Sequence, residues 1–135
     1  MDWIGRYLVV ALLFGALDAA WLGTMGPRLY RPQLGDLMRR KPHVPGALAF
    51  YLLYVAGIVF FAMRPALEDG RWQTALVHGA LLGLVAYGTW DLTNLAVIRE
   101  FPVLIVVADM IWGTVATGAS AAGAYAICSR IDALA

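Results

Sequence analysis

Four long apolar stretches constrain this chain more than any other feature. They cover residues 7–25, 44–63, 72–98 and 102–128. Gly26–Pro27 is predicted to end the first stretch and Pro65 follows the end of the second, whereas Pro102 is a suitable first-turn residue for the fourth. A helix of roughly 20 apolar residues crosses the 30 Å or so of hydrocarbon in a bilayer, and each stretch is about that long or longer. Because backbone N–H and C=O groups cannot stay unpaired in lipid, the stretches are predicted to be helices. The sequence therefore predicts an all-α membrane protein, a four-transmembrane-helix bundle that forms a single domain over residues 1–135.

Composition supports this class. Hydrophobic residues make up 61% of the chain and charged residues only 14%, with a mean hydropathy of +0.72, whereas soluble domains carry about 25% charged residues. A net charge of +1 gives no reason to expect a nucleic-acid partner. The single cysteine, Cys128, excludes an internal disulfide and is expected to pack as a small apolar side chain. The first stretch contains Asp18 and Trp21 and no small-x-small cleavage site, so it is expected to be retained rather than cleaved as a signal peptide.

The connector over residues 27–43 predicts the orientation. It holds half of the basic residues: Arg28, Arg31, Arg39, Arg40 and Lys41. By the positive-inside rule this connector is cytoplasmic, which predicts the orientation of a multi-pass membrane protein. The same basic segment could also recognise phosphate head groups, but a role in setting the topology is the preferred interpretation.

Small residues indicate where helices pack closely. Gly79 and Gly83 are spaced as a close-approach pair, and residues 113–124 are rich in Gly, Ala, Ser and Thr. Such faces let helix backbones approach each other in lipid. They predict tight packing of the bundle and, as partners, membrane lipids and a homo-oligomer formed through the fourth helix.

Three aspartates interrupt the apolar stretches. Asp18, Asp91 and Asp109 each lie about seven or eight residues from the predicted cytoplasmic end of their helix, a depth of roughly 10 to 12 Å. A carboxylate is costly in hydrocarbon, so an aspartate within a span is a functional-site hypothesis by default. The spacing places all three in one layer of the cytoplasmic half.

Polar and aromatic neighbours at helical spacing complete the predicted binding site. Its candidate residues are Asp18, Trp21, Tyr51, Tyr54, Tyr87, Trp90, Asp91, Thr93, Asn94, Asp109 and Trp112. Hydroxyl, amide and indole groups are suitable hydrogen-bond partners for carboxylates. No Lys or Arg falls in the layer, so at least one acid should be protonated or a cation should be present.

Four interpretations of this layer are open. The aspartates could only cross-link helices, or they could wall a pocket that binds a lipid or a small amphipathic molecule. They could serve a membrane enzyme as general acid or base, with Asp18, Asp91 and Asp109 as the catalytic candidates. They could also form a proton-coupled transport path or a metal site, although no His or Cys joins the layer as a metal ligand and no cofactor is assigned. The pocket is the preferred interpretation. His78 lies apart from the layer and is expected to be structural rather than a haem or metal ligand or a proton relay.

Four segments resemble a bacterial membrane-protein family catalogued as domain of unknown function 2177. They are residues 17–23 (LDAAWLG), 50–54 (FYLLY), 86–95 (AYGTWDLTNL) and 109–113 (DMIWG). The resemblance implies a four-helix, multi-pass bundle in the bacterial inner (cytoplasmic) membrane and no established activity. It also implies that Asp18, Trp21, Asp91, Thr93, Asn94, Asp109 and Trp112 form one family-defining set. Trp90 stands where the family pattern would have Tyr, so a role that needs a hydroxyl is not expected at that position.

Overall fold

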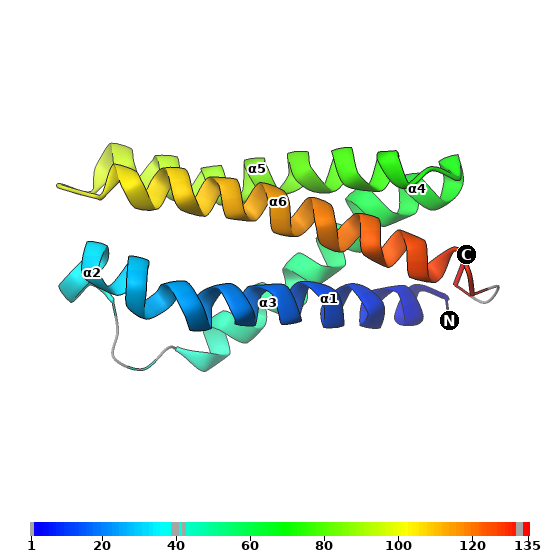
Figure 1. Cartoon of the computed structure of the whole chain (residues 1–135), viewed down its shortest axis with the longest axis horizontal. Helices are drawn as coiled ribbons and strands as arrows, with labels where there is room; N and C mark the ends of the chain where they lie inside the picture. Colours follow the sequence, from blue (N-terminus) through cyan, green and yellow to red (C-terminus); the bar gives the residue numbers. More distant parts are fainter. Residues whose placement is uncertain (1, 39–40, 42, 132–133) are drawn as a thin grey trace.

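The computed structural model of the protein describes residues 2–38, 41, 43–131 and 134–135. It is 88% helical and contains no strand among those residues. Four helical rods build the molecule (Figure 1), and each is long and apolar enough to cross a membrane. The predicted fold class, an all-α four-helix membrane bundle, is confirmed.

Each rod consists of one or more helical segments. The first, Trp3–Leu37, contains α1 (Asp2–Met25), the π turn Gly26–Tyr30, α2 (Arg31–Leu34) and the 3-10 turn Gly35–Leu37. The second, Val44–Asp69, contains α3 (Val44–Ile58), the π turn Val59–Met63 and α4 (Arg64–Asp69). The third and fourth are α5 (Trp72–Val97) and α6 (Val103–Cys128), which closely match the predicted 72–98 and 102–128.

The first rod continues past residue 25, where the Gly26–Pro27 pair predicted its end. Pro27 has no N–H to donate within the helix, and its ring would clash with the carbonyl four residues earlier. The chain accommodates it with a π turn, in which the N–H of Arg31 bonds to the carbonyl of Gly26. Residues 26–37 are therefore helical, and the predicted connector 27–43 is wrong over most of its length. Arg39 and Arg40 lie outside the described residues.

The second rod also exceeds its predicted end at residue 63. Pro65 occupies the first turn of α4, directly after a π turn, so the helix passes the proline without ending. It ends instead at Gly70, whose φ of 70° is the left-handed conformation that favours glycine.

The closest helix pair is α5 with α6, and glycines bring their backbones together. A Cβ added to Gly83 would collide with the main-chain oxygen of Gly113, and one added to Gly79 would lie 2.9 Å from that of Thr117. The predicted close approach at Gly79 and Gly83 is confirmed, and it occurs within one chain. The small-residue face of α6 is buried in the same way, including Gly113, Thr117, Gly118, Ser120, Ala121 and Ala124.

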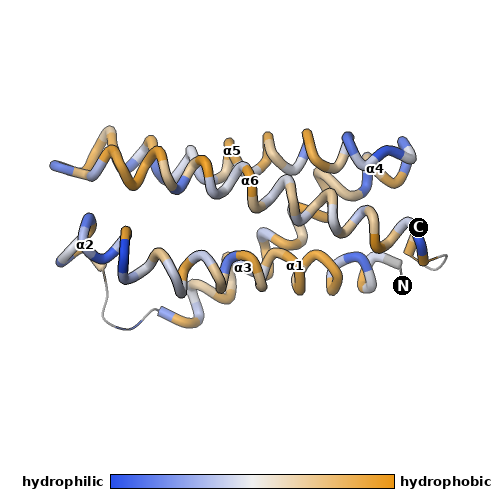
Figure 2. Tube along the Cα trace, in the orientation of Figure 1, coloured by the Kyte–Doolittle hydropathy of each residue, from blue (hydrophilic) through white to orange (hydrophobic). Residues whose placement is uncertain are grey.

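The first rod packs on α6 toward both ends, since Tyr30 belongs to one buried cluster with Ile105 and Val106. The second rod packs on the α5–α6 pair mainly toward the end that carries both termini (Figure 1). Val10, Phe14, Ile58 and Met63 are fully buried there. At the opposite end α3 diverges from the bundle, and residues 44–50 are all exposed. Hydrophilic residues concentrate at the two ends of the long axis, with apolar residues between them (Figure 2), as expected for a spanning bundle.

Candidate functional site

Three carboxyl groups come together inside the bundle, at the half from which α3 diverges. Asp18 on α1 is half-buried, Asp109 on α6 is 9% exposed, and Asp91 on α5 is 0% exposed. The carboxyls of Asp18 and Asp91 both interact with that of Asp109. Asp109 is therefore the member of the layer that neighbours the other two.

A short hydrogen-bonded chain holds Asp109. The hydroxyl of Tyr30 donates to Asp109 Oδ1 at 2.6 Å and accepts from Trp21 Nε1 at 2.8 Å. Trp21 in turn stacks on Trp112, with ring centroids 4.6 Å apart and an interplanar angle of 6°. Three side chains thus fix the orientation of one carboxylate, which is the arrangement of a preorganised polar group.

Tyr30 was not among the predicted site residues. The sequence predicts that Tyr30 lies in the connector that follows Pro27, whereas the π turn continues the rod and buries Tyr30 against α6. The available signal was the continued helical spacing of Trp21, Met25 and Leu29 across the proline, since all three pack in the same cluster as Tyr30.

Asp91 has no hydrogen-bond partner. Both of its carboxyl oxygens are buried and unbonded among the described residues, and so is Trp112 Nε1. The Trp112 indole lies within interacting range of Asp18. An ionised Asp91 would therefore be an uncompensated buried charge.

Two of the predicted tyrosines use their hydroxyls to connect helices. Tyr51 donates to the main-chain oxygen of Ala11, and Tyr54 shares a hydrogen bond of 2.7 Å with Thr117 Oγ1. Tyr87 packs edge-on against Tyr54, with centroids 6.1 Å apart, and its ring occupies the space that a side chain at residue 113 would need.

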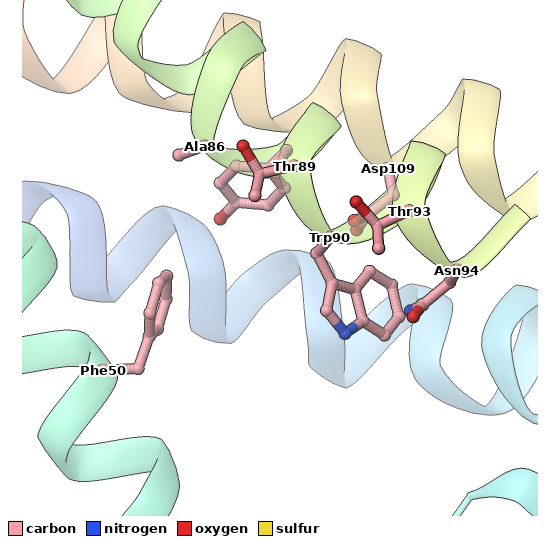
Figure 3. A pocket seen from close by; sticks show the side chains of 8 residues that line it. Phe50, Ala86, Thr89, Trp90, Thr93, Asn94 and Asp109 are labelled. Atoms are coloured by element: carbon pink, nitrogen blue, oxygen red, sulfur yellow. The ribbon is translucent and has the colours of Figure 1, made fainter. Parts of the chain in front are cut away.

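A hollow of about 560 Å³ lies between α5 and the diverging α3. It is lined by Phe50, Ala86, Tyr87, Thr89, Trp90, Thr93, Asn94 and Asp109. Figure 3 shows Phe50 and Ala86 toward one end, and Thr93, Asn94 and Asp109 gathered beside Trp90 at the other. The carboxyl and amide groups of the lining therefore lie toward one end of the hollow, and Phe50 lies toward the other.

A smaller hollow of about 260 Å³ adjoins the first and shares Phe50, Tyr87 and Asp109 with it. Its lining is completed by Asp18, Trp21, Leu22, Ala47, Tyr51 and Trp112. Of the predicted binding residues, Tyr54 and Asp91 line neither hollow, and the others line one or both.

His78 lies apart from these hollows. Its Nδ1 is 3.3 Å from the main-chain oxygen of Phe61. In a helix this oxygen would normally accept from the N–H four residues later, but residue 65 is a proline and has no N–H. The imidazole therefore lies against a carbonyl that lacks its usual donor. Within the described ranges, no group of three or more His, Cys, Asp or Glu side chains is placed to hold a metal ion.

The sequence of residues 3–126 matches a family model described as a predicted membrane protein, domain of unknown function 2177. The chain belongs to this family. The match covers most of the chain, including all three aspartates and Tyr30, and the description of the family agrees with the four candidate spans. Membership supplies no activity. Comparison with curated proteins and with solved structures finds no match.

Proposed function

We propose that this protein binds a lipid or a small amphipathic molecule in the larger hollow, within the cytoplasmic half of the bacterial inner membrane. The observation that carries the proposal is a hollow with apolar walls and a polar end, located within the span and beside a helix that diverges from the bundle. Its volume of about 560 Å³ falls within the range of roughly 300 to 1,000 Å³ typical of small-molecule sites.

The position of α3 supports entry from the bilayer. Phe50 and Trp90 are each 50% exposed, although both line the hollow. In a membrane this exposed surface faces acyl chains rather than water, so a lipid can reach the hollow without crossing the aqueous phase. Apolar and aromatic walls match such a tail, and the group at Thr93, Asn94 and Asp109 matches a polar head.

The proposed orientation rests on basic residues near the hollow. Arg28, Arg31, Lys41 and Arg99 are exposed at the end where α3 diverges. Each would meet an anionic cytoplasmic leaflet favourably, by about 1 kcal/mol per residue near the surface.

Mass spectrometry of molecules that co-purify with the protein tests the proposal. We expect wild type to retain a bound amphipathic molecule, and Ala86→Trp to lose it because the indole fills the hollow that Ala86 lines. Val85→Trp is the matched control, since Val85 is the preceding residue, is 65% exposed and does not line the hollow. An unchanged set of bound molecules in Ala86→Trp would contradict the proposal.

A structural role for the layer is the second candidate function. It is favoured by the bonds that join helices at this level, from Tyr30 to Asp109 and from Tyr54 to Thr117. Interhelical hydrogen bonds of this kind average about 0.6 kcal/mol in membranes. If Ala86→Trp is as stable as wild type and nothing co-purifies with either, this second function is preferred.

A further inference from the structure

The two adjoining hollows differ from a phosphate-binding or carboxylate-binding site in their charge. Asp109 lines both hollows and Asp18 lines the smaller one. None of the described residues that line either hollow is Lys, Arg or His. Anionic head groups are bound in proteins by Arg, Lys or clustered backbone N–H groups. The charge of this site therefore disfavours an anion.

Asp109 has one oxygen engaged and one available. Oδ1 accepts from Tyr30, and Oδ2 forms no hydrogen bond with the part of the chain that the structure describes. Asp109 is only 9% exposed and lines both hollows. A ligand bound in one of the hollows is therefore the group that can reach Oδ2. A carboxylate oxygen accepts hydrogen bonds, so the group that completes it is a donor.

The neighbours of Asp109 strengthen this preference. The hydroxyl hydrogen of Tyr30 is directed at Asp109, and the same hydroxyl accepts from Trp21, so Tyr30 has no hydrogen left to offer a ligand. Asp91 lies behind Asp109 as a second buried carboxyl. Thr89 donates its hydroxyl hydrogen to the main-chain oxygen of Val85 at 2.6 Å. The Trp90 and Trp112 indoles and the Asn94 amide still offer neutral donors, but among the described residues of the lining the carboxyls are the charged groups that face a head group.

We infer that the ligand is a long-chain amphipathic molecule whose head group donates hydrogen bonds and carries no negative charge, an alcohol or an amine, held at Asp109. This inference rests on the proposed function and specifies its ligand class. The apolar tail lies along Phe50 and Ala86, and the head lies beside Asn94 and Asp109, following the two ends of the hollow in Figure 3.

Native mass spectrometry of the purified protein in detergent tests the inference. Four probes share one alkyl tail and end in a primary alcohol, a primary amine, a carboxylate or a phosphate. We expect wild type and Val85→Trp to bind the alcohol or the amine at least about tenfold more tightly than either anion, the ratio that one hydrogen bond to a carboxylate supplies. We expect Ala86→Trp to bind none of the four selectively.

The outcomes separate this inference from the proposed function. If wild type binds the anions as tightly as the donors and Ala86→Trp abolishes that binding, the hollow is a ligand site but the inferred head group is wrong. If no probe distinguishes wild type from Ala86→Trp, the proposed function fails as well.

Thr93→Lys gives a gain-of-function check, since Thr93 is exposed and lines the hollow. The ammonium group of the introduced lysine should shift the binding preference toward the carboxylate and phosphate probes.

Discussion

At the scale of single residues, Tyr30 connects the first rod to α6. Its hydroxyl donates a hydrogen bond of 2.6 Å to Asp109 Oδ1, and hydrogen bonds between a hydroxyl and an ionised carboxylate are among the stronger ones in proteins. The same hydroxyl receives the Trp21 indole N–H. Removing this one oxygen leaves a carboxylate and an indole without a partner.

We expect Tyr30→Phe to lower the free energy of unfolding by about 1 to 3 kcal/mol, since the substitution leaves two polar groups unsatisfied. Denaturation in mild detergent, followed by circular dichroism, measures the change. Tyr125→Phe is the matched control: Tyr125 is partly buried on α6, and its hydroxyl forms no hydrogen bond within the described residues. Equal losses in the two variants would show that the Tyr30 hydroxyl has no special role.

Asp91 presents the opposite case, a buried polar residue that forms no hydrogen bond with the residues that the structure describes. A protonated Asp91 is already neutral, and Asn is a neutral side chain of similar volume, so the exchange alters neither the buried charge nor the packing to a large extent. We therefore expect Asp91→Asn to unfold at the same denaturant concentration as wild type or a higher one. In the infrared spectrum, the carbonyl band of a protonated carboxyl should be present in wild type and absent from Asp91→Asn.

Asp109→Ala provides the contrast, because it removes the acceptor for Tyr30 and should be clearly destabilised. A loss of several kcal/mol in Asp91→Asn would instead indicate that the carboxylate of Asp91 is ionised and paired. A stable Asp91→Asn variant that binds ligand as wild type does would count against acid–base catalysis and proton transport at this residue.

At the scale of elements, sequence reasoning succeeded where one local signal decides the outcome. Pro102 before α6 and the hydropathy of α5 located both helices, and the spacing of Gly79 and Gly83 indicated the contact between them. It failed at Pro27 and Pro65, because a π turn that carries a rod past a proline is stabilised by tertiary packing rather than by local preference.

The candidate site, too, is predictable from the sequence only where one local signal is sufficient. The depth of a residue in the membrane increases by about 1.5 Å for each residue from the end of its helix. Counting residues is therefore sufficient to place Asp18, Asp91 and Asp109 in one layer. The rotation of each helix about its axis depends on the packing of its neighbours, and this rotation buries Asp91 while directing Asp109 into the hollows. Tyr30 could not be placed until the first rod was known to continue.

We expect Gly83→Ala to destabilise the contact between α5 and α6 because the added methyl group collides with the main-chain oxygen of Gly113, which cannot move without moving α6. Overpacking of this kind costs about 1 to 3 kcal/mol in free energy of unfolding. Gly57→Ala is the control on α3: a Cβ there meets nothing within 4 Å, so the helical preference of Ala should make this variant neutral or slightly more stable. Equal stability of the two variants would show that the contact is looser than the structure indicates.

At the scale of the whole molecule, the bundle has one tightly packed half and one open half. Phe14, Ile58 and Met63 fill the half near the termini, whereas the divergence of α3 leaves the hollows in the other. The homo-oligomer stays a prediction. The small residues of α6 on which it rested are buried inside one chain, so a second copy would have to contact a different face, such as the exposed Val107, Ile111 and Val115.

The orientation of the whole molecule decides which leaflet supplies the hollow. We expect the end with Lys41 to face the cytoplasm and the end with Glu68 to face the opposite side, because basic residues are retained on the cytoplasmic side. Single-cysteine variants test this in a Cys128→Ala background, where the buried native thiol is removed.

A membrane-impermeant maleimide added to intact cells, or to spheroplasts where an outer membrane is present, should label Glu68→Cys and leave Lys41→Cys unlabelled. Permeabilising the inner membrane should make both reactive, since both positions are exposed in the structure. The reverse pattern would place the hollows in the outer leaflet, where the ligand would have to be drawn from a different pool of lipids. The fold and the position of the Asp109 carboxyl would be unaffected, because neither depends on which side of the membrane the basic end faces.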